Sequence, residues 1–110
     1  YKFAQAYPVG ELKHGPFALV SEKTAVFIID MEHSAKVYAT YSEILARNGN
    51  PIMISTKPYT KHVNSIILPD TMQGEISTVV LFQIMAMRIA SIKKNNIDKP
   101  TNLAKCVTVV

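Results

Sequence analysis

The sequence predicts a layered α/β fold with a mainly parallel sheet, and three observations support this prediction. Three apolar segments have the length of strands, at residues 25–29, 52–55 and 65–68. A helical pattern separates the first two segments, and a longer helical pattern follows the third. Because strand, helix and strand in this order form a right-handed crossover unit, we expect parallel pairing, with helices on both faces of the sheet.

The N-terminal half contains the first strand and the first helix. Residues 1–23 combine glycines, two prolines and mixed polar side chains, which predicts mostly loop. Residues 25–29 are continuously apolar, as in a strand that is covered on both faces. A helix should begin at Ser34, a candidate N-cap, with apolar residues at helical spacing through residues 37–45. The sequence NGNP at residues 48–51 should end it, because glycine suits a left-handed cap and proline cannot continue a helix.

The C-terminal half contains two short strands and a long helix. Residues 74–95 are apolar on almost every side, which predicts a helix buried against a sheet or a partner subunit. Gln83 and Arg88 interrupt this segment, so a membrane span of about 18 uninterrupted apolar residues is not favoured. Three strands alone leave unprotected sheet edges, so we expect further strands and a helix on the N-terminal side.

The composition indicates part of one folded domain. Of the 110 residues, 48% are hydrophobic and 18% are charged. The 12 basic and 8 acidic side chains give a net charge of +4, but the lysines are scattered and aromatic residues make up only 8%. Nucleic-acid binding is therefore not expected. The single cysteine, Cys106, excludes an internal disulfide and a cysteine-built zinc site, and it fits a reducing compartment such as the cytoplasm.

A small group of ionisable residues follows the first predicted strand. Asp30, Glu32 and His33 lie close together at a position where open parallel sheets commonly bind ligands. Their spacing matches no metal-binding motif. We therefore favour a solvated loop over a metal site at these residues.

Two other side chains are candidates for catalysis. His14 lies between Lys13 and a Gly-Pro breaker, and an imidazole can exchange protons near neutral pH. Lys105 lies in a tail after Pro100, and a lysine amine can form a Schiff base with a ketose. The competing interpretations are a loop histidine bonded only to backbone and an ordinary surface lysine. From the pattern alone, the competing interpretations are favoured.

Two motifs change this balance: GELKHGP at residues 10–16 and NLAK at residues 102–105. In this order and separation they resemble the C-terminal end of the glucosamine-6-phosphate synthase family, and the resemblance runs through residues 1–110. The first motif alone would indicate only a sugar isomerase (SIS) domain. The resemblance implies a three-layer αβα SIS-type domain whose C-terminal portion is residues 1–97 and whose N-terminal part is missing. Residues 98–110 would be an irregular, substrate-covering tail.

The resemblance also implies a reaction, in which fructose 6-phosphate and glutamine give glucosamine 6-phosphate and glutamate at the start of hexosamine synthesis. His14 would assist ring opening of the sugar in the neighbouring subunit of a homodimer. Lys105 would form a Schiff base with the sugar carbonyl, and the backbone of Ala104 would approach the substrate. No cofactor, metal, membrane or nucleic acid is expected, and the enzyme would be cytoplasmic.

The family's glutamate base, phosphate-binding loop and glutaminase domain would all lie upstream, so the fragment alone should be inactive. Two alternatives stay open: a related SIS enzyme that isomerises or deglycates another sugar phosphate, and a non-catalytic module that senses sugar phosphates. An upstream glutaminase domain would exclude the first, and the amine of Lys105 argues against the second. Cys106, Val110 and Gln5 depart from the residues usual in the family, but His14 and Lys105 are retained.

Overall fold

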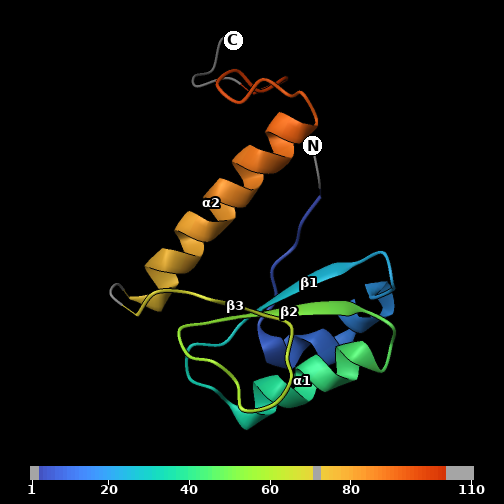
Figure 1. Ribbon diagram of the computed structural model, residues 1–110. Helices are drawn as coiled ribbons and strands as arrows, with labels where there is room; N and C mark the ends of the chain where they lie inside the picture. The colour runs from blue at the N-terminus through green and yellow to red at the C-terminus, as the bar shows by residue number, and fades with distance from the viewer. Residues whose placement is uncertain (1–2, 71–72, 104–110) are drawn as a thin grey trace.

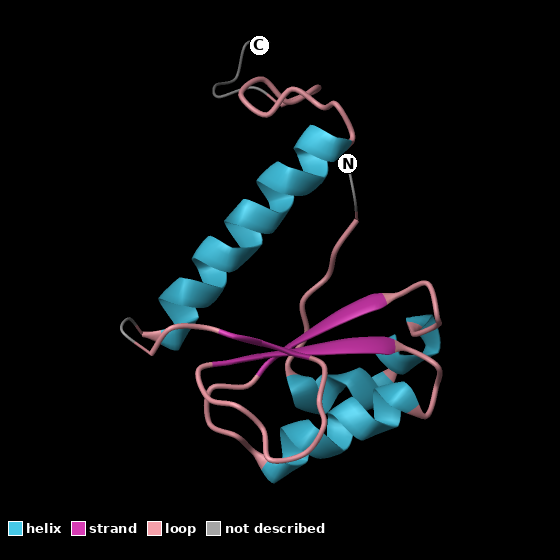
Figure 2. Cartoon of the chain, in the orientation of Figure 1, coloured by secondary structure: helices cyan, strands magenta, loops and turns pink. Residues whose placement is uncertain are grey.

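The computed structural model describes residues 3–70 and 73–103. Its elements in chain order are two 3₁₀ helices, η1 (Val9–His14) and η2 (Pro16–Leu19), β1 (Ala25–Ile29), α1 (Ala35–Leu45), β2 (Asn50–Ser55), β3 (Ser65–Ile67) and α2 (Gly74–Ile92) (Figure 1). The strands lie between α1 on one side and α2 on the other (Figure 2). The predicted α/β class is confirmed.

The three strands form one parallel sheet in the order β1-β2-β3. Ala25 pairs with Asn50 at the start of the β1–β2 ladder, and Met53 pairs with Ser65 at the start of the β2–β3 ladder. Because all strands run in the same direction, their carboxyl ends meet at one edge of the sheet. β1, α1 and β2 form the predicted strand–helix–strand unit with parallel strands.

The hydrophobic core lies between the sheet and α1. It consists of Ile28 from β1, Met53 from β2, and Tyr41 and Ile44 from α1. Ile44 and Met53 are both 0% exposed. Complete burial of such a side chain contributes about 1.5–3 kcal/mol, so this layer fixes the position of α1 on the sheet.

Residues 9–19 are more regular than the sequence predicted. They form η1 and η2, which lie on the same side of the sheet as α1 (Figure 1). Glycine and proline prevent long elements here but permit single 3₁₀ turns. Val9, Phe17 and Val20 pack against the core cluster, and this packing stabilises a segment that local propensity alone would leave as loop.

Both ends of α1 differ in detail from the prediction. Ser34 occupies the N-cap position, but its side chain makes no capping hydrogen bond; its backbone N–H donates to Asp30 Oδ1 at 3.2 Å. At the other end, Asn48 and not Gly49 adopts the left-handed conformation, with φ of 58°. Gly49 is needed for space, because a Cβ there would lie 2.6 Å from methyl carbons of Ile44 and Val20.

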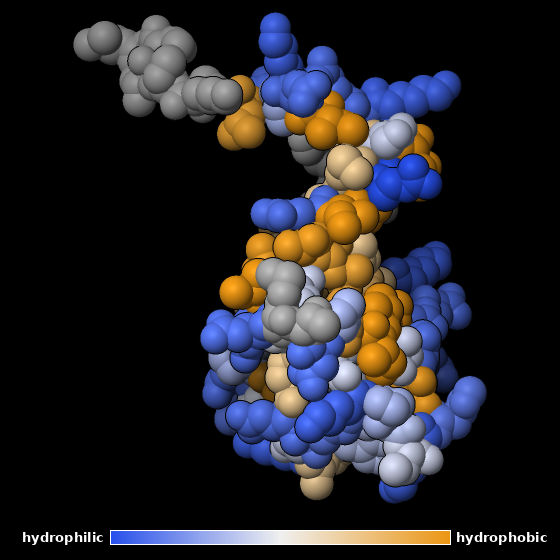
Figure 3. Space-filling model, turned by 60° about the vertical axis from the view of Figure 1, so that its left-hand side comes forward, coloured by the Kyte–Doolittle hydropathy of each residue, from blue (hydrophilic) through white to orange (hydrophobic). Residues whose placement is uncertain are grey.

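Helix α2 is much less buried within this chain than its composition predicted. Thr78 is its only buried residue. Phe82 packs edge-on against Phe27 of β1, with ring centroids 5.5 Å apart, so the helix contacts the sheet face opposite α1. Further along, apolar side chains are exposed and form a continuous apolar surface (Figure 3). The large exposed apolar residues of α2 are Ile76, Val79, Val80, Ile84, Met87, Ile89 and Ile92.

Of the two covers predicted for α2, a sheet and a partner subunit, the sheet buries little of the helix within this chain, and the helix ends at Ile92, not at residue 95. Among the described residues, α2 is also the one helix with the length and apolar composition to cross a membrane. Core helices of other proteins meet the same criterion. An exposed apolar helix surface of this kind is typical of a site that further protein covers, and α2 also exposes the polar residues Gln83 and Arg88.

Candidate functional site

The predicted catalytic histidine lies where two 3₁₀ helices meet. His14 is the last residue of η1, and η2 begins two residues later at Pro16. Gly15 between them has φ of 140°, in the positive region that glycine adopts readily and other residues do not. The GELKHGP sequence thus forms a turn that presents the exposed imidazole of His14 at the surface.

The turn is attached to the neighbouring helix by an ion pair. Lys13 Nζ lies 2.8 Å from Glu43 Oε1 of α1. The two side chains are 52% and 34% exposed, so the pair is screened by solvent and contributes little to overall stability. It does, however, connect the residue next to His14 to a helix that is anchored in the core.

The second predicted catalytic residue lies outside the described residues, as do Ala104 and Cys106. The structure therefore does not test whether Lys105 approaches His14. The described part of the tail ends at Leu103, which is exposed. The pairing of an imidazole with the Lys105 amine stays a prediction.

A separate group of polar residues gathers at the carboxyl edge of the sheet. Asp30, directly after β1, is only 3% exposed. Its Oδ2 accepts a hydrogen bond of 2.8 Å from the Tyr59 hydroxyl, and its Oδ1 accepts one from the Ser34 backbone N–H. The expectation of a solvated loop is therefore wrong for Asp30, because two donors satisfy the carboxylate and allow its burial.

Tyr59 responds to this environment. Burial, followed by the hydrogen bond to Asp30 and the negative charge of its carboxylate, raises the pKa of Tyr59 well above that of an ordinary tyrosine. The ring of His33 stacks on Tyr59 with centroids 4.6 Å apart. His33 Nε2 is buried and has no hydrogen-bond partner among residues 3–70 and 73–103.

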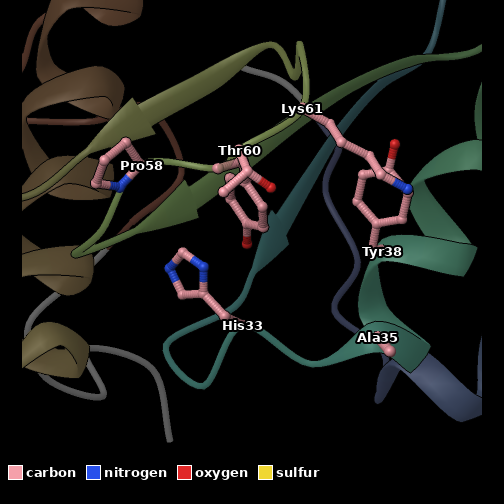
Figure 4. A pocket seen from close by; sticks show the side chains of 7 residues that line it. His33, Ala35, Tyr38, Pro58, Thr60 and Lys61 are labelled. Carbon is pink, nitrogen blue, oxygen red and sulfur yellow. The ribbon is translucent and has the colours of Figure 1, made fainter.

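His33 and Tyr59 line an open cleft of about 320 Å³ (Figure 4). Lys61 Nζ lies 4.7 Å from the ring centroid of Tyr38 on the opposite side. Within the described residues, no group of three His, Cys, Asp or Glu side chains is placed to hold a metal ion. His14 does not line this cleft.

Sequence reasoning identified Asp30 and His33 but missed Tyr59. Tyr59 and its hydrogen-bond partner Asp30 are 29 residues apart and lie after different strands. The available signal was positional: both follow the carboxyl end of a strand in a predicted parallel sheet, so their loops meet at the same edge. The pattern could not show that the tyrosine hydroxyl reaches the carboxylate.

Replacing Tyr59 by phenylalanine should lower the free energy of unfolding by about 1–3 kcal/mol near neutral pH, because a buried oxygen of Asp30 loses its donor. The folded-state pKa of Tyr59 is raised, so the contribution of the hydroxyl is complete below about pH 10 and falls as the pH rises above it. Chemical denaturation of the full-length protein at pH 7 to 11 measures both effects. Tyr38→Phe, on the other side of the cleft, is the control and should keep the parent's stability. Equal stability of Tyr59→Phe and the parent would contradict the role of this bond.

The chain was compared with known proteins. No family model matches it. It is 36% identical to the glutamine–fructose-6-phosphate aminotransferase (isomerizing) of Caulobacter vibrioides, 40% identical to that of Buchnera aphidicola and 42% identical to that of Corynebacterium glutamicum. Each match covers 99% of the chain.

The fold defines a domain of the α/β class with a parallel sheet, and the comparisons make this assignment specific. The chain is homologous, along essentially its whole length, to a segment of the glutamine–fructose-6-phosphate aminotransferases. The family resemblance predicted from the two motifs is thereby confirmed. The chain spans only 19–20% of the length of these relatives.

Proposed function

We propose that this chain is part of an enzyme that converts fructose 6-phosphate and glutamine to glucosamine 6-phosphate and glutamate. The observation that carries this proposal is the similarity of 36–42% identity over 99% of the chain to curated enzymes of that name. The full-length protein would include a glutaminase domain that releases ammonia. It would act in the cytoplasm, at the first step of hexosamine synthesis.

Residues 1–97 form, in this proposal, the C-terminal portion of an SIS domain, and residues 98–110 form a tail over the substrate. The three parallel strands with a helix on each face support an SIS-type αβα arrangement. The remaining strands and helices of the domain would cover the apolar surface of α2. Burial of that surface would shield from water the apolar side chains that α2 exposes in the described part of the chain.

The proposed chemistry divides between two side chains. The imidazole of His14 transfers a proton to or from the ring oxygen as the sugar opens to its carbonyl form. The amine of Lys105 then adds to the carbonyl carbon and water leaves, which gives an imine; the backbone of Ala104 lies beside the substrate. In this proposal the protein is a homodimer, and the exposed imidazole of His14 serves the partner's site.

Neither alternative function gains support from the comparisons. The relatives named above all carry the aminotransferase name. A deglycase or isomerase for another sugar phosphate would share the turn around His14 but would not require a glutaminase domain. A sensor of sugar phosphates would not require the Lys105 amine.

An assay of the full-length protein with both substrates tests the proposal. We expect glucosamine 6-phosphate to form only when fructose 6-phosphate and glutamine are both present, measured by chromatography of the sugar phosphates. The isolated 110 residues should give no turnover, since much of the site lies upstream. Sugar isomerisation without any amination would favour the alternative isomerase, and turnover by the fragment would contradict the proposed division of the site.

A further inference from the structure

Glu43 of α1 and Arg47, two residues after the end of α1, contact the chain on both sides of His14. Glu43 contacts Lys13, immediately before the histidine, and Arg47 contacts Phe17, shortly after it. We propose that Glu43 and Arg47 are positioning residues that set the place of the His14 imidazole for sugar conversion. This inference rests on the proposed function and assigns a role to a helix that carries none of the predicted catalytic groups.

The first contact fixes the end of η1. Lys13 Nζ donates a hydrogen bond of 2.8 Å to Glu43 Oε1. Lys13 is the residue next to His14, so the direction in which the imidazole leaves the backbone depends on how this residue is held. No other side-chain hydrogen bond is found for Lys13 or His14 within residues 3–70 and 73–103.

The second contact fixes the start of η2. The guanidinium carbon of Arg47 lies 4.4 Å from the centroid of the Phe17 ring, in a cation–π arrangement. Arg47 Nη1 also donates a hydrogen bond of 2.8 Å to the backbone carbonyl oxygen of Glu43. This bond orients the guanidinium, because Arg47 lies just after the last turn of α1.

The spacing of the two contacts matches the turn that they hold. Glu43 lies in the last turn of α1 and Arg47 lies two residues beyond its end, and the hydrogen bond from Arg47 Nη1 to the Glu43 carbonyl oxygen keeps the two residues close together. Lys13 and Phe17 are four residues apart, as Glu43 and Arg47 are, and they lie on the two sides of Gly15. The two contacts therefore hold the turn on both sides of His14, in addition to the packing of Val9 and Phe17 against the core cluster.

The helix that makes these contacts is itself fixed. Ile44, adjacent to Glu43, is 0% exposed and belongs to the core between α1 and the sheet. A series of contacts thus connects the core, through α1 and Arg47, to Lys13 and Phe17, which lie on either side of His14. His14 has no such support of its own, because its side chain is exposed.

The expected effect is on rate more than on stability. An exposed ion pair contributes little to folding. A small misplacement of a proton-transferring group, in contrast, lowers a catalysed rate strongly, because the reacting atoms must lie within a narrow range of distances. Loss of either contact should therefore lower kcat for the sugar reaction while glutamine hydrolysis is retained.

The test uses the full-length protein with Glu43→Gln, Lys13→Met, Arg47→Leu and the charge-exchanged double variant Lys13→Glu/Glu43→Lys. Each variant that breaks a contact should lower kcat for glucosamine 6-phosphate formation about 5- to 50-fold, with KM for fructose 6-phosphate within about 3-fold of the parent. The charge-exchanged variant should recover at least half of the loss on a logarithmic scale. Glu22→Gln is the matched control, because Glu22 is an exposed carboxylate before β1.

The outcomes separate this inference from the proposed function. If Glu43→Gln, Lys13→Met and Arg47→Leu keep the parent's kcat while His14→Ala does not, the positioning role is wrong and the proposed function stands. If His14→Ala also keeps the parent's kcat, the proposed role of the histidine fails first. If single variants lose activity but charge exchange restores none, the ion pair is not the cause, and the inference is overturned. Recovery of kcat by charge exchange supports it, since a general loss of folding would not be repaired by a reversed pair.

Discussion

Replacing His14 by alanine in the full-length protein should lower the rate of sugar conversion by roughly 10²- to 10⁴-fold, the range by which a positioned acid or base accelerates proton transfer. Glutamine hydrolysis should keep its rate, because the glutaminase domain would form a separate site. The two activities are measured in parallel, as glucosamine 6-phosphate formed and as glutamate released.

His14→Ala should remove the imidazole without changing the fold around it. His14 is exposed and contributes to no buried cluster, so alanine removes an imidazole without opening a cavity. The positive φ between the two 3₁₀ helices belongs to Gly15, and it does not depend on the side chain before it. Loss of activity can therefore be assigned to the missing proton carrier.

A matched control is available elsewhere on the chain. His62 is also an exposed loop histidine, between β2 and β3. His62→Ala should leave both activities at the parent's level. Equal rates of sugar conversion for His14→Ala and the parent would remove His14 from the mechanism, whatever the family resemblance.

The predictability of the fold followed the strength of the local pattern. The run AVFII at residues 25–29 predicted β1 with the observed bounds, because a continuous apolar run between polar segments has few other solutions. Helix α2 shows the limit of the same reasoning. A helix that is apolar on all sides must be covered, but its pattern does not say by what, and within this chain Thr78 is its only buried residue.

Other differences have physical reasons that a linear pattern does not contain. The residue in the left-handed conformation after α1 is Asn48, because asparagine tolerates this conformation. Glycine is needed at position 49 for a different reason, since a Cβ there would collide with Ile44. Asp30 is buried because Tyr59, which is distant in sequence, donates to it. Both outcomes depend on tertiary contacts.

The surroundings of the two candidate catalytic residues, His14 and Lys105, were predictable to different degrees. The residues around His14 predicted mostly loop with a Gly-Pro breaker, and the structure has two short 3₁₀ helices on either side of Gly15. The contacts of that turn with Glu43 and Arg47 were not predictable, since nothing in the sequence pairs η1 and η2 with one side of α1. Lys105 was identified from the tail motif alone.

The Lys105 amine leads to the second large effect. Lys105→Arg in the full-length protein should lower sugar conversion by at least about 10³-fold, the scale seen when a covalent catalytic group is removed. Arginine keeps the positive charge but does not lose its proton in proteins, so it cannot add to a carbonyl. Lys99→Arg is the control, because Lys99 is an exposed lysine of the same tail.

Chemical trapping tests the covalent step directly. Incubation of the parent with fructose 6-phosphate and borohydride should reduce the imine to a stable secondary amine, with hydride from the borohydride adding to the former carbonyl carbon. Peptide mapping should then find the sugar on Lys105 and on no other lysine. Sugar attached to a different residue would assign the Schiff base elsewhere.

A mixture of the two inactive variants tests whether the groups meet across a dimer. In a heterodimer of His14→Ala and Lys105→Arg subunits, the site with an intact Lys105 would receive an intact His14 from its partner. Because random mixing makes about half of the dimers mixed, and each mixed dimer has one complete site, activity should return to about a quarter of the parent's. If both groups instead came from one subunit, no dimer would contain a complete site and the mixture would stay inactive. Recovery therefore measures the sharing of His14 between subunits, which neither single variant can do.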